Sequence, residues 1–382
     1  MWPRCCCLWG IAALAVLGMH CAIGAPHTPA NDADVIADLP AGVRHVSESA
    51  RALTATRLDV ALPLAQLDIS RARSTGDMRF LGYAEAILAP WLKQPTIAPQ
   101  VLLLNATILQ SRHAFEPALA QLDRALLVHP NDPQAWLIRA TILRVLGRYD
   151  EALSSCQHLT LEAEPAVTSL CVQSLRGLMG HLPEAYAAIL SLSQEALPPQ
   201  ARAWRFSELG EMAERLGEDE VAERWFLSGL QIAPEDVYMR TAYADLLLRR
   251  ERPLEALKLS SGFESMEPML LRAAIAHREL HDAAGSAANA QISTLFAVER
   301  QRGDAVHRRE LARFLLDIGD NPDAALRAAQ ENWQVQREPD DLLILLRAAK
   351  VAHQLAASAG AREFLHKTGL EDARLAPYRG PV

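Results

Sequence analysis

His277 and His281 have the spacing of a metal site. Residues four apart lie on one face of a helix, so both imidazoles could bind one ion, and Glu279 or Asp282 could add an oxygen ligand. The glutamate does not stand where a metalloprotease has its base, and no third histidine follows nearby. Exposed histidines are common on helices. We therefore treat the pair as a weak metal candidate and predict no bound metal.

No other combination of residues suggests catalysis. The chain contains no GxSxG, no Walker phosphate loop, no paired CxxC and no HExxH. Its net charge of −8 is unfavourable for nucleic-acid binding, which needs a basic face to neutralise phosphates. We expect a non-enzymatic protein that has no cofactor and does not bind nucleic acid.

The first 25 residues have the layout of a secretory signal peptide. Arg4 is followed by an apolar run from Cys5 to Met19 and then by the small residues CAIGA. The run is short for a membrane span of about 20 residues, although an uncleaved anchor would also fit. Bulky His20 makes Cys21 a poor lipoprotein cysteine. We expect an exported, periplasmic protein that reaches a membrane only through a partner.

Removal of this leader would leave two cysteines, Cys156 and Cys171. In an oxidising compartment such a pair can form a disulfide. Two buried thiols that pack as small apolar groups fit equally well. The sequence leaves both alternatives open.

The stretch from Pro133 to Pro165 shows the unit from which most of the chain is built. It predicts two amphipathic helices joined at Gly147, since glycine readily takes the left-handed conformation that ends a helix. Ala152 stands just inside the second helix, where its small side chain lets a neighbouring helix approach. The unit is therefore a helix–turn–helix hairpin.

This small residue recurs at intervals of 34, 33, 37, 34, 34 and 34 residues. It falls at Ala118, Ala152, Ala185, Ala222, Ala256, Ala290 and Ala324. In most units a turn residue stands five residues before it, namely Gly147, Gly180, Gly217, Gly285 or Gly319, with His113 and Glu251 as exceptions. A period near 34 residues is typical of a helical solenoid.

The units resemble tetratricopeptide repeats. The best match runs from Ala203 to Asp236 and carries, at the family's packing positions, Phe206, Leu209, Gly210, Ala213, Ala222, Phe226, Gly229 and Pro234. The resemblance implies an all-α, right-handed superhelical solenoid of stacked hairpins, whose first helices line a concave groove. It also implies a protein or peptide partner.

These observations together divide the chain into six expected segments. Residues 1–25 are the signal peptide, 26–47 a linker rich in Pro, Ala and Asp, and 48–98 a degenerate first hairpin. Residues 99–270 form the repeat array, 271–372 form divergent repeats and capping helices, and 373–382 form a tail.

Acidic residues recur on the expected groove face downstream of residue 203. The same face is mostly apolar or uncharged further upstream. An acidic half beside an apolar half would suit a basic or amphipathic segment, although an ordinary solvated helix surface would look the same. The candidate partner-binding residues are Trp204, Glu208, Glu211, Glu214, Asp245 and Glu279.

The leading hypothesis is thus an exported scaffold that binds a protein or peptide in its groove, in envelope assembly, secretion or a membrane complex. The alternative is an accessory subunit that binds a metal ion or small ligand at His277 and His281.

Overall fold

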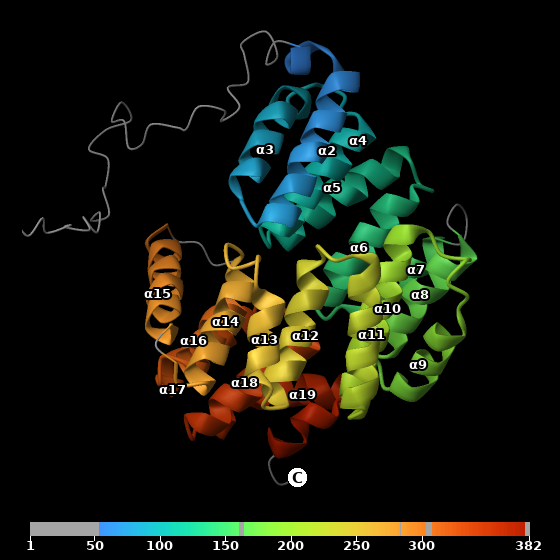
Figure 1. Ribbon diagram of the computed structural model, residues 1–382. Coiled ribbons are helices and arrows are strands. Elements are labelled where there is room, and N and C mark those ends of the chain that lie inside the picture. Colours follow the sequence, from blue (N-terminus) through green and yellow to red (C-terminus); the bar gives the residue numbers. More distant parts are fainter. Residues whose placement is uncertain (1–52, 160–163, 283, 303–307, 379–382) are drawn as a thin grey trace, which may run out of the picture. The chain divides into compact units, whose positions relative to one another are not determined.

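The computed structural model describes residues 53–159, 164–282, 284–302 and 308–378 (Figure 1). The expected signal peptide and linker lie outside these residues. The described part is helical and contains no strand. None of its helices is long and apolar enough to cross a bilayer.

The helices follow one another as antiparallel pairs, and successive helices contact each other from α2 to α15 and again from α16 to α19 (Figure 1). The upstream pairs are α2 (Leu58–Thr75) with α3 (Arg79–Leu92), α4 (Pro99–Ser111) with α5 (Phe115–Val128), α6 (Pro133–Val145) with α7 (Tyr149–His158), and α8 (Pro165–Arg176) with α9 (Leu182–Ser191). The next are α10 (Pro199–Leu216) with α11 (Asp219–Ile232), α12 (Val237–Arg249) with α13 (Pro253–Ser260), and α14 (Glu267–Glu279) with α15 (Gly285–Arg302). The last are α16 (Arg308–Asp317) with α17 (Pro322–Trp333), and α18 (Pro339–Val351) with η2 (Leu355–Ser358), α19 (Ala359–Thr368) and η3 (Ala373–Tyr378).

This arrangement is the TPR-like solenoid of helical hairpins expected from the period. Proline opens many of the helices, where its missing N–H has no helical partner to lose. Asp132 and Asp236 cap α6 and α12 by accepting hydrogen bonds from backbone N–H groups of the first turn.

Close packing within and between the pairs depends on small residues. A Cβ on Gly210 would lie 2.4 Å from the ring of Phe226 in the same pair, and one on Gly229 would lie 2.3 Å from the sulfur of Met239 in the next pair. A larger residue at either position would force the facing side chain to move. The recurring alanines are fully buried at positions 118, 152, 185, 222 and 256.

The expected phase of the repeat is wrong in the last two units. Ala290 is exposed, and Ala325 rather than Ala324 is fully buried. The left-handed turn residues there are His281 and Asp320, with φ of 52° and 46°, instead of Gly285 and Gly319. The period persists, but a shift of one residue turns a side chain by about 100° around a helix, so spacing alone does not fix the buried face.

The C-terminal helices share a hydrophobic core with helices far upstream. One cluster of buried residues combines side chains of α4–α8 with side chains of α16–α19 and η3. The rings of Tyr149 and Phe364 lie 5.7 Å apart, and the N–H of Arg337 donates to the carbonyl of Val145. The end of the chain therefore packs against the middle of the solenoid.

Candidate functional site

The first helices of the downstream hairpins form a closed circuit. Helix α10 contacts α12, α12 contacts α14, α14 contacts α16, α16 contacts α18, α18 contacts η3, and η3 contacts α10 again. We call these six elements the ring. The ring lines a cavity of about 1120 Å³ that is open to solvent.

Residues 371–375 close the ring, and both ion pairs and apolar burial hold them in place. The guanidinium of Arg374 lies 2.9 Å from Asp340, 2.8 Å from Asp372 and 3.9 Å from Glu214 of α10. Leu375 is fully buried. The carboxylate of Glu371 accepts a hydrogen bond from the first N–H of α9. Residues 371–375 thus join α18 to α9 and α10.

Trp204 and Glu208 lie in the interior rather than on an open face. The indole N–H of Trp204 donates to Glu208, which is 4% exposed and accepts a second hydrogen bond from Arg144 at 2.6 Å. Arg144 also lies 3.7 Å from Glu211 and 3.4 Å from Glu338. One guanidinium of α6 therefore faces three carboxylates from α10 and the start of α18.

Burial changes the protonation of the acidic residues on α10. Burial, together with the charge of Glu208, raises the pKa of Glu211 to about 8, although Arg144 opposes the shift. Burial raises the pKa of Glu214 to about 7 against the opposing charges of Arg374 and Arg249. Both groups exchange protons near neutral pH.

Asp245 behaves differently because two arginines face it. Burial alone would raise its pKa, but the charges of Arg272 and Arg313 lower it to about 2. Arg272 is 3% exposed and also pairs with Glu310 of α16. This buried ion pair joins α14 to α16. Because Arg272 also pairs with Asp245, it connects both helices to α12.

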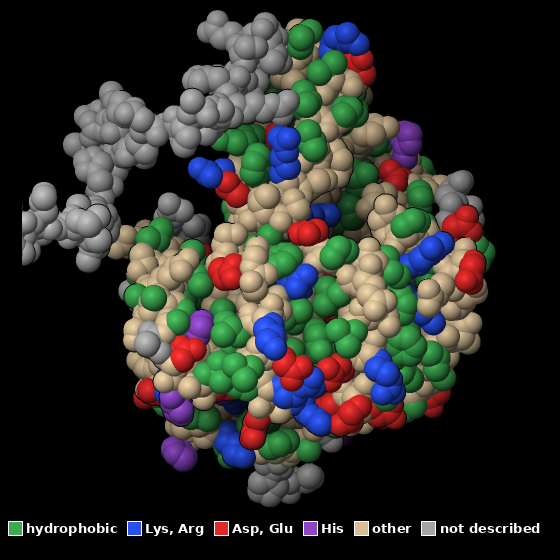
Figure 2. Space-filling view, in the orientation of Figure 1, with side chains coloured by type: hydrophobic (Ala, Val, Ile, Leu, Met, Phe, Trp, Pro, Cys, Tyr) green, Lys and Arg blue, Asp and Glu red, His purple; other side chains and the backbone are tan. Residues whose placement is uncertain are grey.

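The cavity has two walls of opposite charge. The inner wall is made by residues 214–281, and its charged groups are Glu214, Asp219, Asp245, Arg249, Glu251, Arg272, Arg278 and Glu279. The C-terminal wall is made by residues 309–378, and its charged groups are Arg309, Arg313, Asp317, Asp340, Arg347 and Arg374. Carboxylates outnumber arginines by five to three on the inner wall, whereas arginines outnumber carboxylates by four to two on the C-terminal wall. Figure 2 shows acidic and basic side chains interspersed on the face in view.

Of the predicted partner-binding residues, Glu214, Asp245 and Glu279 line the cavity, whereas Trp204, Glu208 and Glu211 do not. Glu279 is exposed, and Glu251 beside it is exposed as well. Neither has an ion-pair partner within the described part of the chain. Among the acidic groups of the inner wall, these two remain available to a ligand.

The sequence interpretation did not include the arginines of the C-terminal wall. Arg309, Arg313 and Asp317 follow one another at intervals of four residues along α16, so they share one helix face. That spacing could have indicated a charged inner face on α16. The approach of this face to α10 and α12 could not be read from the spacing.

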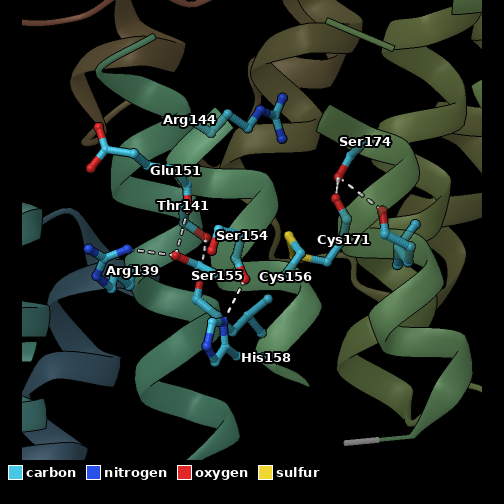
Figure 3. Close-up of a disulfide and its surroundings, with 12 residues drawn as sticks. Arg139, Thr141, Arg144, Glu151, Ser154, Ser155, Cys156, His158, Cys171 and Ser174 are labelled. Atoms are coloured by element: carbon cyan, nitrogen blue, oxygen red, sulfur yellow. Dashed lines mark hydrogen bonds between the residues drawn. A yellow bond between two sulfur atoms is a disulfide. The ribbon is translucent and has the colours of Figure 1, made fainter. Parts of the chain in front are cut away.

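Cys156 of α7 and Cys171 of α8 are joined by a disulfide, with their Cα atoms 5.7 Å apart (Figure 3). Both residues belong to the buried core. The bond links adjacent hairpins and lies outside the ring.

His277 and His281 do not form a shared site. His277 pairs through Nδ1 with Asp282 at 2.7 Å, while His281 is exposed in the turn after α14. Within the described ranges, no group of three or more His, Cys, Asp or Glu side chains is placed to hold a metal ion.

Comparisons with known proteins give only distant similarities. No protein-family model and no curated protein matches the chain. Among solved structures, the human IFIT1 dimer with PPP-AAAA is 14% identical with a TM-score of 0.44 and covers 83% of this chain and 93% of its own. The pilF protein of Pseudomonas aeruginosa is 18% identical with a TM-score of 0.32, covering 67% and 98%. Yeast Tom70 is 11% identical with a TM-score of 0.30, covering 83% and 86%. These values are too low for any functional property to be transferred.

Proposed function

We propose that this protein is an exported, non-enzymatic scaffold that binds a segment of another protein in the cavity of the ring. The observation that carries the proposal is the charged cavity itself. Small-molecule pockets usually span about 300–1,000 Å³ and are mostly apolar. This cavity is about 1120 Å³, and half of its lining residues are acidic or basic. A polypeptide with polar side chains matches such a site better than a small apolar ligand.

The place of action we propose is the cell envelope. The support is the arrangement of Arg4, the apolar run and the small residues in the first 25 positions. The disulfide is consistent with an oxidising compartment. A scaffold there would serve envelope assembly, secretion or a membrane complex.

Photo-crosslinking in the native host tests this function. Benzoylphenylalanine would replace Tyr378, an aromatic residue that lines the cavity and carries none of its charges, and in a matched strain it would replace Glu184, an exposed residue of α9 outside the cavity. We expect a specific protein adduct in the envelope fraction from position 378 only. The same adducts from both positions, or none from position 378, would contradict the proposal.

A further inference from the structure

The charge distribution around the cavity restricts what can bind there. The inner wall carries an excess of carboxylates, and the C-terminal wall carries an excess of arginines. A ligand with charges of one sign would be attracted to one wall and repelled by the other. An apolar ligand would remove charged groups of both walls from water without replacing their solvation.

On the inner wall, the groups free to pair are carboxylates. Glu251 follows α12 and Glu279 ends α14, and no ion pair engages either one in the described residues. The arginines of this wall are already engaged, Arg249 by Glu214 and Asp219, and Arg278 by Asp320. This wall can therefore accept a basic group.

On the C-terminal wall, the groups with spare capacity are guanidinium groups. Arg313 pairs with both Asp245 and Asp317, whereas the only ion pair of Arg347 within the described residues is with Asp317. A guanidinium has five N–H donors. Arg347 directs some of them at Asp317, and its side chain remains 34% exposed. Arg347 can therefore also hold a ligand carboxylate.

The acceptor for the basic group and the donor for the acidic group lie at the same end of the cavity. Asp317 pairs directly with Arg347, and Arg278, the residue before Glu279, donates a hydrogen bond to the carbonyl of Ile318, the residue after Asp317. A ligand that uses both sites must therefore carry its opposite charges close together.

We propose that the cavity takes a short peptide segment with neighbouring basic and acidic side chains, the basic one at Glu279 and the acidic one at Arg347. This inference rests on the proposed function, since it names the chemistry of the segment that the scaffold binds. The peptide would bind through charged groups that are partly exposed to solvent, so its affinity should fall as added salt screens the charges.

Fluorescence anisotropy with synthetic peptides tests the inference on the intact purified protein. The probes are labelled peptides of equal length made of alternating Glu-Lys, of Glu only, of Lys only, and of Gly-Ser. We expect the alternating peptide to bind about tenfold or more tightly than each of the others. A single-sign peptide that binds as well, or no binding of the alternating peptide, would overturn the inference.

Matched variants locate the binding. Glu279→Gln and Arg347→Gln should each weaken the alternating peptide about tenfold. Glu184→Gln on α9 and Arg224→Gln on α11, both exposed and outside the cavity, should leave its affinity unchanged. Glu279 has no ion pair, so its variant keeps the fold even if the loss of Arg347 disturbs α16. Unchanged affinity in Glu279→Gln would refute the site.

Failure of this inference can be separated from failure of the proposed function. If position 378 crosslinks to a partner but the alternating peptide has no advantage, the ligand chemistry is wrong and the scaffold role stands. If position 378 yields no adduct, the scaffold role is wrong too.

Discussion

Hairpins α4–α9 and the ring are stabilised by different kinds of contact. Ion pairs within the upstream hairpins lie on the surface, as with Arg148 and Glu116, which are 37% and 70% exposed. The ring has exposed pairs too, but it also contains buried ones, as with Arg272 and Glu310, which are 3% and 8% exposed. Surface pairs contribute about 0–1 kcal/mol, whereas removing one partner of a buried pair costs about 3–5 kcal/mol. Closure of the ring therefore depends on charge pairing, while the upstream stack depends on apolar packing and a disulfide.

Arg272→Met should have the largest effect on stability. The change leaves Glu310 and Asp245 without their shared partner, and we expect the free energy of unfolding to fall by about 3–5 kcal/mol. Urea denaturation followed by circular dichroism measures it. Arg148→Met is the matched control in the upstream hairpins and should cost about 1 kcal/mol or less. Equal losses in the two variants would show that the two regions are not stabilised differently.

Removing the disulfide should destabilise the upstream half. The bond closes a loop with a sequence separation of 15 residues, for which chain entropy gives about 3 kcal/mol. The double variant Cys156→Ser/Cys171→Ser should lower the urea midpoint accordingly, in low and in high salt alike. Hydrogen exchange should rise first in α7 and α8. Early exchange in α18 and η3 instead would mean that the bond also supports the ring.

The stability of the ring should fall as pH rises from about 4.5 to 8. The folded state holds the pKa of Glu211 at about 8 and that of Glu214 at about 7, above the ordinary value of 4.5. The folded state therefore binds these protons more tightly than the unfolded state, and this contribution is lost as they dissociate. We expect urea denaturation to show stability falling steadily across this range.

Glu211→Gln isolates the source of this pH dependence. The amide cannot ionise, so the variant should lose less stability than the wild type between pH 5 and pH 8.5. Glu220→Gln, on the exposed start of α11, is the control and should leave the dependence unchanged. A wild-type curve that is flat across this range would disprove the assignment.

The two regions also differ in how far sequence predicts them. The hairpins up to residue 260 follow from local signals, since Ala118 to Ala256 repeat at the buried position and Gly147, Gly180 and Gly217 take left-handed turns. Helical spacing likewise places Glu214, Asp245 and Glu279 on one face. Closure of the ring is different, because it depends on small rotations that accumulate over several hairpins. The repeat period does not specify these rotations, so the pairing of Glu214 with Arg374 could not be predicted from the sequence.

Helix caps provide the smallest and most discriminating test, because a cap acts only on its own helix. The carboxylate of Asp132 accepts from the N–H groups of Gln134 and Ala135 at the start of α6, and that of Asp236 accepts from Met239 at the start of α12. Asp132→Ala and Asp236→Ala should each cost about 1 kcal/mol in urea denaturation, although α6 belongs to the upstream hairpins and α12 to the ring. Equal costs at both sites would show that the regions differ in long-range pairing and not in the quality of their helices. A much larger cost for Asp236→Ala would mean instead that the ring transmits local damage at one helix to the whole circuit.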